Sequence, residues 1–319
     1  MSTTTTPAFT TGIASEASHW YDKDGNPAYD VPNESKAVKC TVCTGSLRSA
    51  AAKAVTAACS HCDAEGWQYP EMRPATLRDA KKLDNGHSVT GVTRVVANYN
   101  IVAYQLQQLE DACATATPET EALRHTALDL WRKQVRFDAA QHASQAAATG
   151  NNIHATIERG IRGESLVGYQ YAAWFDAFKL ECEKMFGCWP MFEAEKSFTN
   201  RRLGYGCKVD ALGFYATAEG RQNILIDTKT KDIEKLDKMP KAWDAEIMQL
   251  AANREAAKMP TARCFNAFTD RKEPVVFFVE ADEPALRRGW VMFQHCLAIK
   301  QLQDNYRPSW CLDGPLLQA

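Results

Sequence analysis

The hydrophobic pattern of the chain changes at Pro190, and this change limits the possible folds more than any other feature. Between Ser88 and Gly187 apolar residues recur every three or four positions, a spacing that predicts helices. After Pro190 three consecutive runs alternate between apolar and polar residues, as half-buried strands do. These runs cover residues 191–200, 206–216 and 223–230. We therefore expect a three-stranded meander that follows a helical region.

The remaining segments complete an expected α/β fold, a mixed sheet flanked by helices. Before the meander, the sequence Gly150-Asn151-Asn152 predicts a break in the chain, with Asn152 capping a new helix. The expected helices cover residues 153–161, 166–186, 241–259 and 283–306, and two further strands cover residues 262–270 and 274–282.

Composition divides the 319 residues into three expected parts. Residues 1–37 are rich in Thr, Ser, Asp, Asn and Pro, which predicts a flexible N-terminal arm. Residues 38–87 contain four paired cysteines and form the second part. Residues 88–319 form the third, helical over residues 88–188 with the sheet core over residues 189–319.

Charge, hydropathy and cysteine content limit the partners and the compartment. No apolar run approaches the ~20 residues of a membrane-spanning helix, and the first residues lack the layout of a signal peptide, so we expect a cytoplasmic protein without membrane contact. Eleven cysteines, mostly single, favour a reducing compartment. With a net charge of -2, any site for a polyanion must come from local clustering of the 37 basic residues.

Carboxylates interrupt two neighbouring strands of the expected meander. Asp210 lies in the second run, and Asp227 follows the buried-strand letters "NILI" in the third. Mg²⁺ binds one or two carboxylates and completes its shell with water and phosphate. Lys229 shares a face with Asp227, because strand side chains alternate, and can orient a water or offset charge on a phosphate. The alternative is a surface ion pair on an edge strand, but a carboxylate after a buried run needs a stronger partner.

Four stretches resemble motifs of one nuclease family. "VDALGFYATAEGRQNILIDTKTKD" resembles the metal-binding core of the PD-(D/E)XK nuclease superfamily. "GNNIHATIERGIRGE" and "EIMQLAANREAA" resemble the histidine and glutamine motifs of its RecB-like branch, and "HSVTGVTRVV" resembles the opening segment of that branch. The motifs stand in the family's order between Ser88 and Tyr306. The resemblance implies a restriction-endonuclease-like core and a DNA nuclease that uses one or two Mg²⁺ or Mn²⁺ ions.

The resemblance also implies a role for each matching residue. The metal ligands would be His154, Asp210, Asp227 and, through its backbone carbonyl, Thr228. The catalytic set would be Lys229, Asp210, Asp227, Gln249 and Glu195. Glu195 is preferred to Glu193, although alternation puts both on one face. Glu158 lies one turn after His154 and shares its helix face.

Two positions depart from the family's pattern. The glycine usual three residues before the first aspartate is Cys207 here, with Gly206 one place earlier. Asn253 stands where a tyrosine often follows the glutamine motif.

Basic residues flank the proposed site and predict a path for DNA. Phosphate contacts from such side chains give affinity that does not depend on base sequence. The candidates are Arg201, Arg202, Lys208, Lys231, Lys235 and Lys238. The alternative is a solvated loop, since acidic residues alternate with the lysines after Lys229. Trp174, Tyr205 and Trp243 could stack on bases, but aromatic residues at helical spacing are more often core.

The cysteine pairs predict a structural zinc site. Two C-x₂-C pairs fifteen residues apart match the spacing of four thiolates around one Zn²⁺. The four ligands would be Cys40, Cys43, Cys59 and Cys62. Some RecB-like nucleases carry an iron–sulfur cluster instead, but the downstream cysteines here, Cys264, Cys296 and Cys311, are too widely spaced for that pattern.

Together with the metal-binding pattern, the resemblance implies a metal-dependent DNA exonuclease of phage or bacterial type, with exonuclease chosen over endonuclease by resemblance alone. DNA is the expected partner, together with a single-strand-annealing, replication or recombination protein. A catalytically silent zinc-containing DNA-binding scaffold, a structure-selective endonuclease and a protein-interaction adaptor remain as alternatives.

Overall fold

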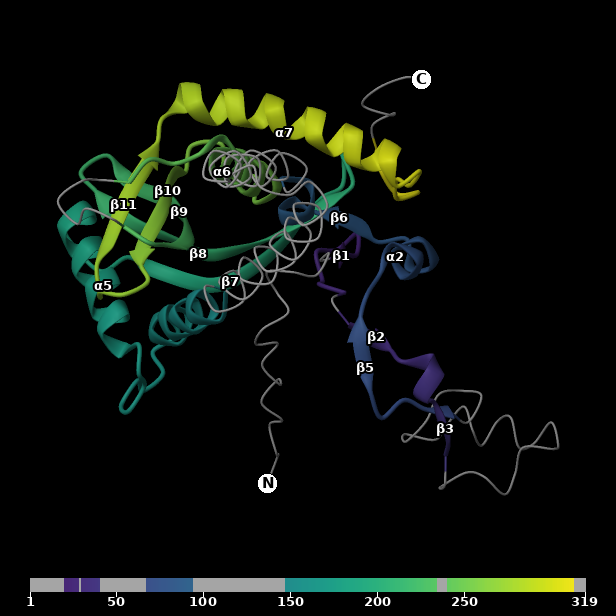
Figure 1. Cartoon of the computed structure of the whole chain (residues 1–319). Helices are drawn as coiled ribbons and strands as arrows, with labels where there is room; N and C mark the ends of the chain where they lie inside the picture. The colour runs from purple at the N-terminus through teal and green to yellow at the C-terminus, as the bar shows by residue number, and fades with distance from the viewer. Residues whose placement is uncertain (1–19, 29, 41–66, 94–146, 234–239, 313–319) are drawn as a thin grey trace, which may run out of the picture.

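A mixed seven-stranded sheet forms the centre of the chain in the computed structural model, which describes residues 20–28, 30–40, 67–93, 147–233 and 240–312 (Figure 1). Its strand order is β1-β6-β8-β9-β10-β11, with β7 also paired to β8. The strands are β1 (Trp20–Tyr21), β6 (Gly86–Ser88), β7 (Met191–Asn200), β8 (Tyr205–Thr217), β9 (Gly220–Lys231), β10 (Arg263–Asp270) and β11 (Val276–Ala281).

The expected meander is present. β7, β8 and β9 pair antiparallel in sequence order. The chain then crosses over through α6 (Asp244–Ala256), and β10 pairs parallel to β9 before β11 returns antiparallel. The prediction of an α/β fold with a mixed sheet flanked by helices is therefore confirmed.

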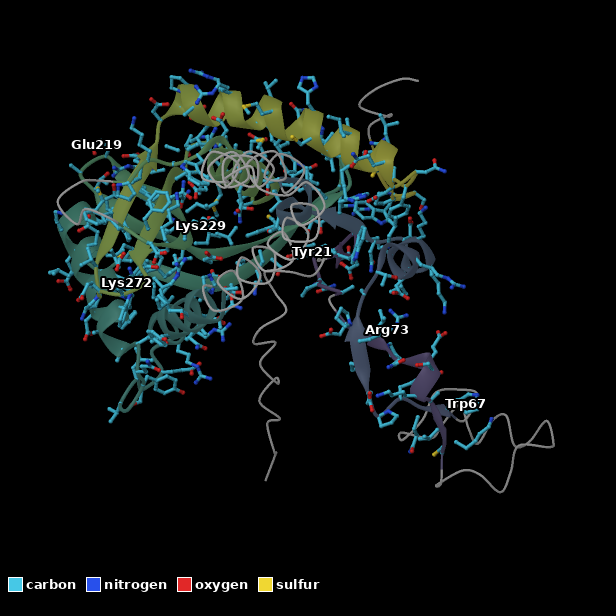
Figure 2. The ribbon with its side chains drawn as sticks, in the orientation of Figure 1. Tyr21, Trp67, Arg73, Glu219, Lys229 and Lys272 are labelled. Atoms are coloured by element: carbon cyan, nitrogen blue, oxygen red, sulfur yellow. The ribbon has the colours of Figure 1, made fainter. Side chains whose placement is uncertain are left out.

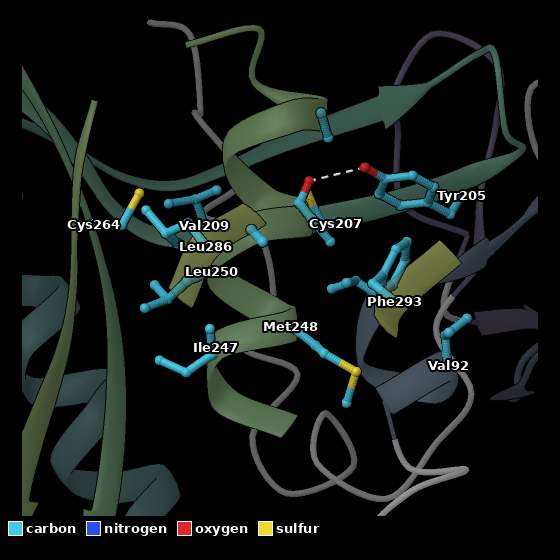
Figure 3. Close-up of a cluster of buried hydrophobic side chains, with 14 of the residues drawn as sticks. Val92, Tyr205, Cys207, Val209, Ile247, Met248, Leu250, Cys264, Leu286 and Phe293 are labelled. Carbon is cyan, nitrogen blue, oxygen red and sulfur yellow. Dashed lines mark hydrogen bonds between the residues drawn. The ribbon is translucent and has the colours of Figure 1, made fainter. Parts of the chain in front are cut away.

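Helices cover both faces of this sheet and enclose two apolar cores. On one face, α6 and α7 (Glu283–Gln303) bury Leu225, Met248 and Phe293, and the Tyr205 hydroxyl donates a 2.9 Å hydrogen bond to the carbonyl of Ala252 (Figure 3). On the other face, α5 (Ala172–Phe186) and helical residues 147–161 pack against the sheet. This second core contains Ile153, Ile157, Phe178, Ile226 and Phe265. Each such side chain contributes about 1.5–3 kcal/mol when fully buried.

The predicted break at Gly150-Asn151-Asn152 is wrong, because residues 147–161 form one continuous helix. Asn152 does not cap it: its backbone carbonyl accepts a 2.8 Å hydrogen bond from the Thr156 hydroxyl. A Cβ atom at Gly150 would lie 3.4 Å from Thr230, an ordinary van der Waals distance, so this turn of the helix lies directly against β9. Packing of the helix on the sheet outweighs the low helix propensity of these residues.

Part of the segment assigned to a flexible arm is built into the sheet. Trp20 and Tyr21 are buried and pair antiparallel with β6, which itself pairs parallel with the start of β8. A Cβ atom at Gly206 would lie 2.2 Å from the Tyr21 side chain, so this glycine provides the space in which Tyr21 docks. The pairing of β6 also spans the boundary drawn between residues 87 and 88. Residues 1–19 lie outside the described residues.

The remaining N-terminal elements form a small extension. Two short antiparallel pairs, β2 with β5 and β3 with β4, lie away from the main sheet, and α2 links them to β6 (Figure 1). Their bounds are β2 (Asp30–Pro32), η1 (Glu34–Lys36), β3 (Val38–Lys39), β4 (Trp67–Gln68), β5 (Met72–Pro74) and α2 (Leu77–Leu83). Across the described residues, no helix has the length and apolarity needed to cross a membrane.

Candidate metal centre

The candidate site lies where β8 and β9 separate. Their ladder runs from the turn to the pair Ala211 and Ile226, so Asp210 and Asp227 stand at the next position, where the pairing ends. Beyond this fork β8 goes on to pair with β6, and β9 continues along β10. Asp210 Oδ2 accepts a 2.6 Å hydrogen bond from the backbone N–H of Thr228 across the fork. The two carboxylates therefore lie side by side at the end of the β8–β9 ladder, where the two strands no longer pair.

Glu195 on β7 lies beside the fork in an unusual backbone conformation. It stands opposite Asp210 between two regular pairs of the β7–β8 ladder, and its φ is +57°. The face that β8 presents changes here, because Val209 packs in the core under α6 while Ala211 packs in the core under α5. A left-handed conformation costs a non-glycine residue roughly 1–2 kcal/mol, so the surrounding structure must hold it.

His154 reaches the fork from the helix over residues 147–161. Ile153 and Ile157 anchor this helix in the core, which turns the intervening histidine toward β8. His154 Nε2 lies 3.0 Å from Asp210 Oδ2 and 3.7 Å from Glu195 Oε1.

Glu158 joins the same cluster from the next helical turn. One ligand atom from each of His154, Glu158 and Glu195 lies within 4.8 Å of the others. Glu158 also forms a 2.5 Å ion pair with Arg162 Nη2. These three side chains form a group of nitrogen and oxygen donors that could hold a metal ion.

Lys229 and Gln249 both contact Asp227. Lys229 Nζ lies 2.6 Å from Asp227 Oδ2, on the same face of β9, inside the sheet domain (Figure 2). Gln249 on α6 donates a 2.9 Å hydrogen bond from Nε2 to Asp227 Oδ1. The Asp227 side chain is only 1% exposed, whereas that of Lys229 is 27% exposed. The glutamine therefore fixes the orientation of the buried carboxylate, and the lysine ammonium that pairs with it is partly exposed to solvent.

The environment pushes the pKa values of the two aspartates in opposite directions. Burial raises the pKa of Asp227 to about 6, because the nearby Lys229 offsets only part of the desolvation and Asp210 adds repulsion. Burial acts on Asp210 in the same sense, but His154, Lys229 and the Thr228 N–H outweigh it and lower its pKa to about 2. For Lys229 the carboxylates outweigh burial and raise the pKa, so it carries a proton at neutral pH.

The donor set fits a hard divalent cation. Both carboxylate oxygens of Glu195 are buried and accept no hydrogen bond from any described residue, and their charge faces Lys208 and His154. Carboxylates with one imidazole suit Mg²⁺ or Mn²⁺, and a metal ion could share the charge of Glu195 with Lys208. The residues at the fork therefore fit the metal that the family resemblance implies. Thr228 uses its N–H here, and the role of its carbonyl stays a prediction.

Four of the six predicted DNA-binding residues lie in the described part of the chain, and these four occupy different places. Lys208 lies in the site, paired with Glu195, and Lys231 pairs with Glu246 at 2.8 Å. Arg201 and Arg202 lie at the far end of the β7–β8 hairpin, where their backbone carbonyls accept hydrogen bonds from the C-terminal segment: the Leu312 N–H donates at 3.1 Å and the Arg307 guanidinium at 3.3 Å. Lys235 and Lys238 lie outside the described residues.

Of the three aromatic candidates, only Trp243 is exposed. Tyr205 is fully buried, and Trp174 donates its indole N–H to the backbone carbonyl of Asp270 at 2.7 Å. Trp243 lies beside Lys231, whose Nζ is 4.8 Å from the centre of the indole ring.

The predicted zinc site falls mostly outside the described part of the chain. Cys40 is buried, and Gln68 Nε2 lies 3.5 Å from its Sγ. Cys43, Cys59 and Cys62 are outside the described residues, so the four-cysteine site stays a prediction.

Sequence reasoning missed two features of the site. One is the ion pair of Lys208 with Glu195; the position of Lys208 two residues before Asp210 was the available signal, and its contact with DNA stays a prediction. Asn266, the partner of Asp227 in the β9–β10 ladder, gave no signal in the sequence.

Comparisons with known proteins leave the function to this geometry. No protein-family model matches the chain, and a search of curated proteins found no match. A solved structure described as "Crystal structure of SSO0001" is 14% identical, over 66% of this chain and 89% of that chain, with a TM-score of 0.26.

Proposed function

We propose that this chain is a metal-dependent DNA nuclease with a PD-(D/E)XK core of the RecB-like type, acting as an exonuclease. The observation that carries the proposal is the convergence at one strand fork of Asp210, Asp227, His154 and Lys229. They come from three separate segments of the chain, and each matches a position of the family's motifs. The pair of Asp227 and Lys229 differs from a surface ion pair in two ways. Its carboxylate is only 1% exposed, and Gln249 from another element donates a hydrogen bond to it.

Each residue has a distinct task in this proposal. Asp210, Asp227, His154 and Glu195 would hold one or two Mg²⁺ or Mn²⁺ ions, with Glu158 beside them. The bound metal would supply Lewis acidity toward the scissile phosphate and acidify a water. Lys229 stays protonated beside the carboxylates and is placed to stabilise charge that develops on the phosphate oxygens. Gln249 keeps Asp227 in a fixed orientation.

The N-terminal cysteines belong to the same proposal as a structural Zn²⁺ site outside the reaction, since four protein ligands leave no open position. DNA is the proposed substrate, and the cytoplasm of a bacterium or of a phage-infected cell is the proposed location.

Digestion of end-labelled linear and covalently closed circular DNA, single and double stranded, tests the function. The reactions contain Mg²⁺, Mn²⁺ or EDTA and compare the natural chain with Asp227→Asn and Lys229→Ala. Loss of linear DNA alone, dependent on metal and abolished by both substitutions, is the expected result. Cleavage of circles would make the chain an endonuclease. DNA binding without cleavage under any condition would favour the silent scaffold.

A further inference from the structure

Asn266 on β10 is the residue paired with Asp227 in the parallel ladder between β10 and β9. Side chains of paired residues point to the same face of a sheet. That face is the one covered by α6, because Leu225 and Cys264, two residues earlier on each strand, pack in the core under α6. Asn266 therefore lies beside Asp227, in the same layer as Gln249.

The carboxamide of Asn266 is fully buried and unsatisfied. Its exposed fraction is 0%, and neither Nδ2 nor Oδ1 forms a hydrogen bond with any described residue. A buried polar group without a partner costs about 1–3 kcal/mol, whereas an apolar side chain of similar size would cost nothing of this kind. The asparagine therefore destabilises the metal-free protein. We look for a second state of the protein in which its amide forms a hydrogen bond.

The contacts of Asp227 indicate what that state is. Its Oδ1 accepts from Gln249, and its Oδ2 faces the ammonium of Lys229 but accepts no hydrogen bond of good geometry. A divalent cation at the fork would compete with Lys229 for the carboxylate. Once the cation has displaced the ammonium, Asp227 loses its contact with Lys229 while it remains buried.

We propose that Asn266 is a positioning residue for Asp227, donating a hydrogen bond from Nδ2 to the aspartate carboxylate when a divalent cation occupies the fork. This inference rests on the proposed function, because it requires a metal site at Asp227. Residues that orient a metal ligand typically change metal affinity or activity 10- to 100-fold when they are replaced.

The test is calorimetric titration of the full-length protein with Mn²⁺ in the absence of DNA, together with the melting temperature in EDTA. Asn266→Leu removes the amide and keeps the branched shape and the number of heavy atoms of the side chain. We expect a melting temperature in EDTA equal to or above that of the natural chain, and an Mn²⁺ affinity at least about 10-fold weaker. Unchanged Mn²⁺ affinity in this variant would overturn the inference.

Asn253→Leu is the matched control. Asn253 is also 0% exposed and unsatisfied, and it lies on α6, one turn after Gln249, rather than beside Asp227 in the ladder. We expect it to change Mn²⁺ affinity less than about 2-fold, well below the effect expected for a group that orients a ligand. If both variants lost Mn²⁺ affinity equally, the loss would come from removing any buried amide near α6. That result would overturn the specific role of Asn266.

A second pair of variants covers the case in which leucine prevents folding. Asn266→Ser keeps a short donor and Asn266→Ala has none, while both leave a similar cavity. Tighter Mn²⁺ binding by the serine variant supports the inference, and equal binding overturns it. If the natural chain binds no Mn²⁺, both this inference and the proposed metal site fail; if it binds Mn²⁺ yet cleaves no DNA, only the nuclease proposal fails.

Discussion

Lys229 and Asp227 form an ion pair of 2.6 Å on one face of β9, at the point where β9 separates from β8. The pair joins a nearly fully buried carboxylate to a lysine that still reaches solvent. In the described state the ammonium supplies the positive charge that the buried carboxylate needs. In the proposed function, a metal ion at the fork would take over that charge and leave the lysine to stabilise charge on a phosphate. In the metal-free protein the same ion pair compensates the buried carboxylate.

Replacement of Lys229 by methionine separates these two tasks. We expect DNA cleavage to fall by about 10²–10³-fold, the loss typical of removing one group that stabilises transition-state charge. Mn²⁺ affinity should stay equal or increase, because the competing ammonium is gone. Gel assays with end-labelled DNA and calorimetric Mn²⁺ titration measure the two effects.

Lys231→Met is the control for this prediction. Lys231 lies two residues further along the same face but pairs with Glu246, so its loss should change cleavage only a few-fold. Cleavage by Lys229→Met at the rate of the natural chain would rule out the proposed role of the lysine.

Gly206→Ala tests the docking of the N-terminal strand. The added methyl group would lie 2.2 Å from the Tyr21 side chain, which is buried against the sheet. Overpacking of this kind typically costs about 1–3 kcal/mol, so we expect a lower free energy of unfolding in urea.

The double variant Gly206→Ala with Tyr21→Ala measures the contact itself. If the clash is with Tyr21, the two substitutions together should cost less than the sum of their separate effects. Strict additivity would mean that residues 20–21 do not pack on Gly206 in solution.

Asp270 should make stability depend on pH. It is buried, and its carboxylate accepts backbone hydrogen bonds from Ile233, Lys272 and Glu273 at 2.7–2.8 Å. Burial alone would raise its pKa, but these N–H donors outweigh burial and hold the pKa below its ordinary value. Its stabilising contribution is therefore full above the unfolded-state pKa of about 3.9 and is lost as the pH falls through the folded-state pKa.

Asp270→Asn replaces one acceptor oxygen with a donor that faces N–H groups. We expect the free energy of unfolding of this variant to be about 1–3 kcal/mol lower than that of the natural chain at pH 7. Below about pH 4 the difference between the two free energies should become smaller. Asp176→Asn on the exposed side of α5 should change the free energy of unfolding little at pH 7, because the side chain faces solvent. A difference that stays constant down to pH 2 would contradict the assigned cause.

The four cysteines predict a measurable metal content. Purified protein should carry about one equivalent of Zn²⁺ by elemental analysis. Cys40→Ser should lose the zinc and melt at a lower temperature, since binding of a structural metal contributes folding free energy. Iron with visible absorbance in place of zinc would show that the spacing was misinterpreted.

The sheet could be predicted from sequence because apolar and polar residues alternate within its strands. The expected strand over residues 191–200 coincides with β7, and the five core strands follow in the expected order. The meeting of Asp210 and Asp227 follows from the same reasoning, because neighbouring strands of a meander place such residues side by side.

Other features depend on contacts between distant segments and leave little local signal. Residues 150–152 are helical only because their helix packs on the sheet, and Trp20 is buried only because β6 offers it an edge. The positive φ of Glu195 arises where two strands change the face they present, which no alternation pattern can reveal.

Glu195 and Glu193 provide a direct test of which carboxylate serves the metal, a choice that alternation leaves open. The Glu195 side chain is 6% exposed and faces His154 and Lys208, whereas that of Glu193 is 66% exposed and pairs with Lys196 on the surface. Gln at position 195 keeps the shape of the side chain and removes one negative charge from the site. We expect Glu195→Gln to weaken Mn²⁺ binding by at least about 10-fold.

Glu193→Gln on the same strand should leave Mn²⁺ binding unchanged, because a surface ion pair contributes at most about 1 kcal/mol and lies outside the donor set. Both affinities can be measured by calorimetry, and the rise in melting temperature on adding Mn²⁺ gives an independent reading. In EDTA, the loss of the buried charge of Glu195 removes its ion pair with Lys208, so some loss of stability in that variant is expected even without metal. Only a loss of Mn²⁺ affinity that is specific to Glu195 identifies it as a ligand, and equal binding in both variants would remove it from the site.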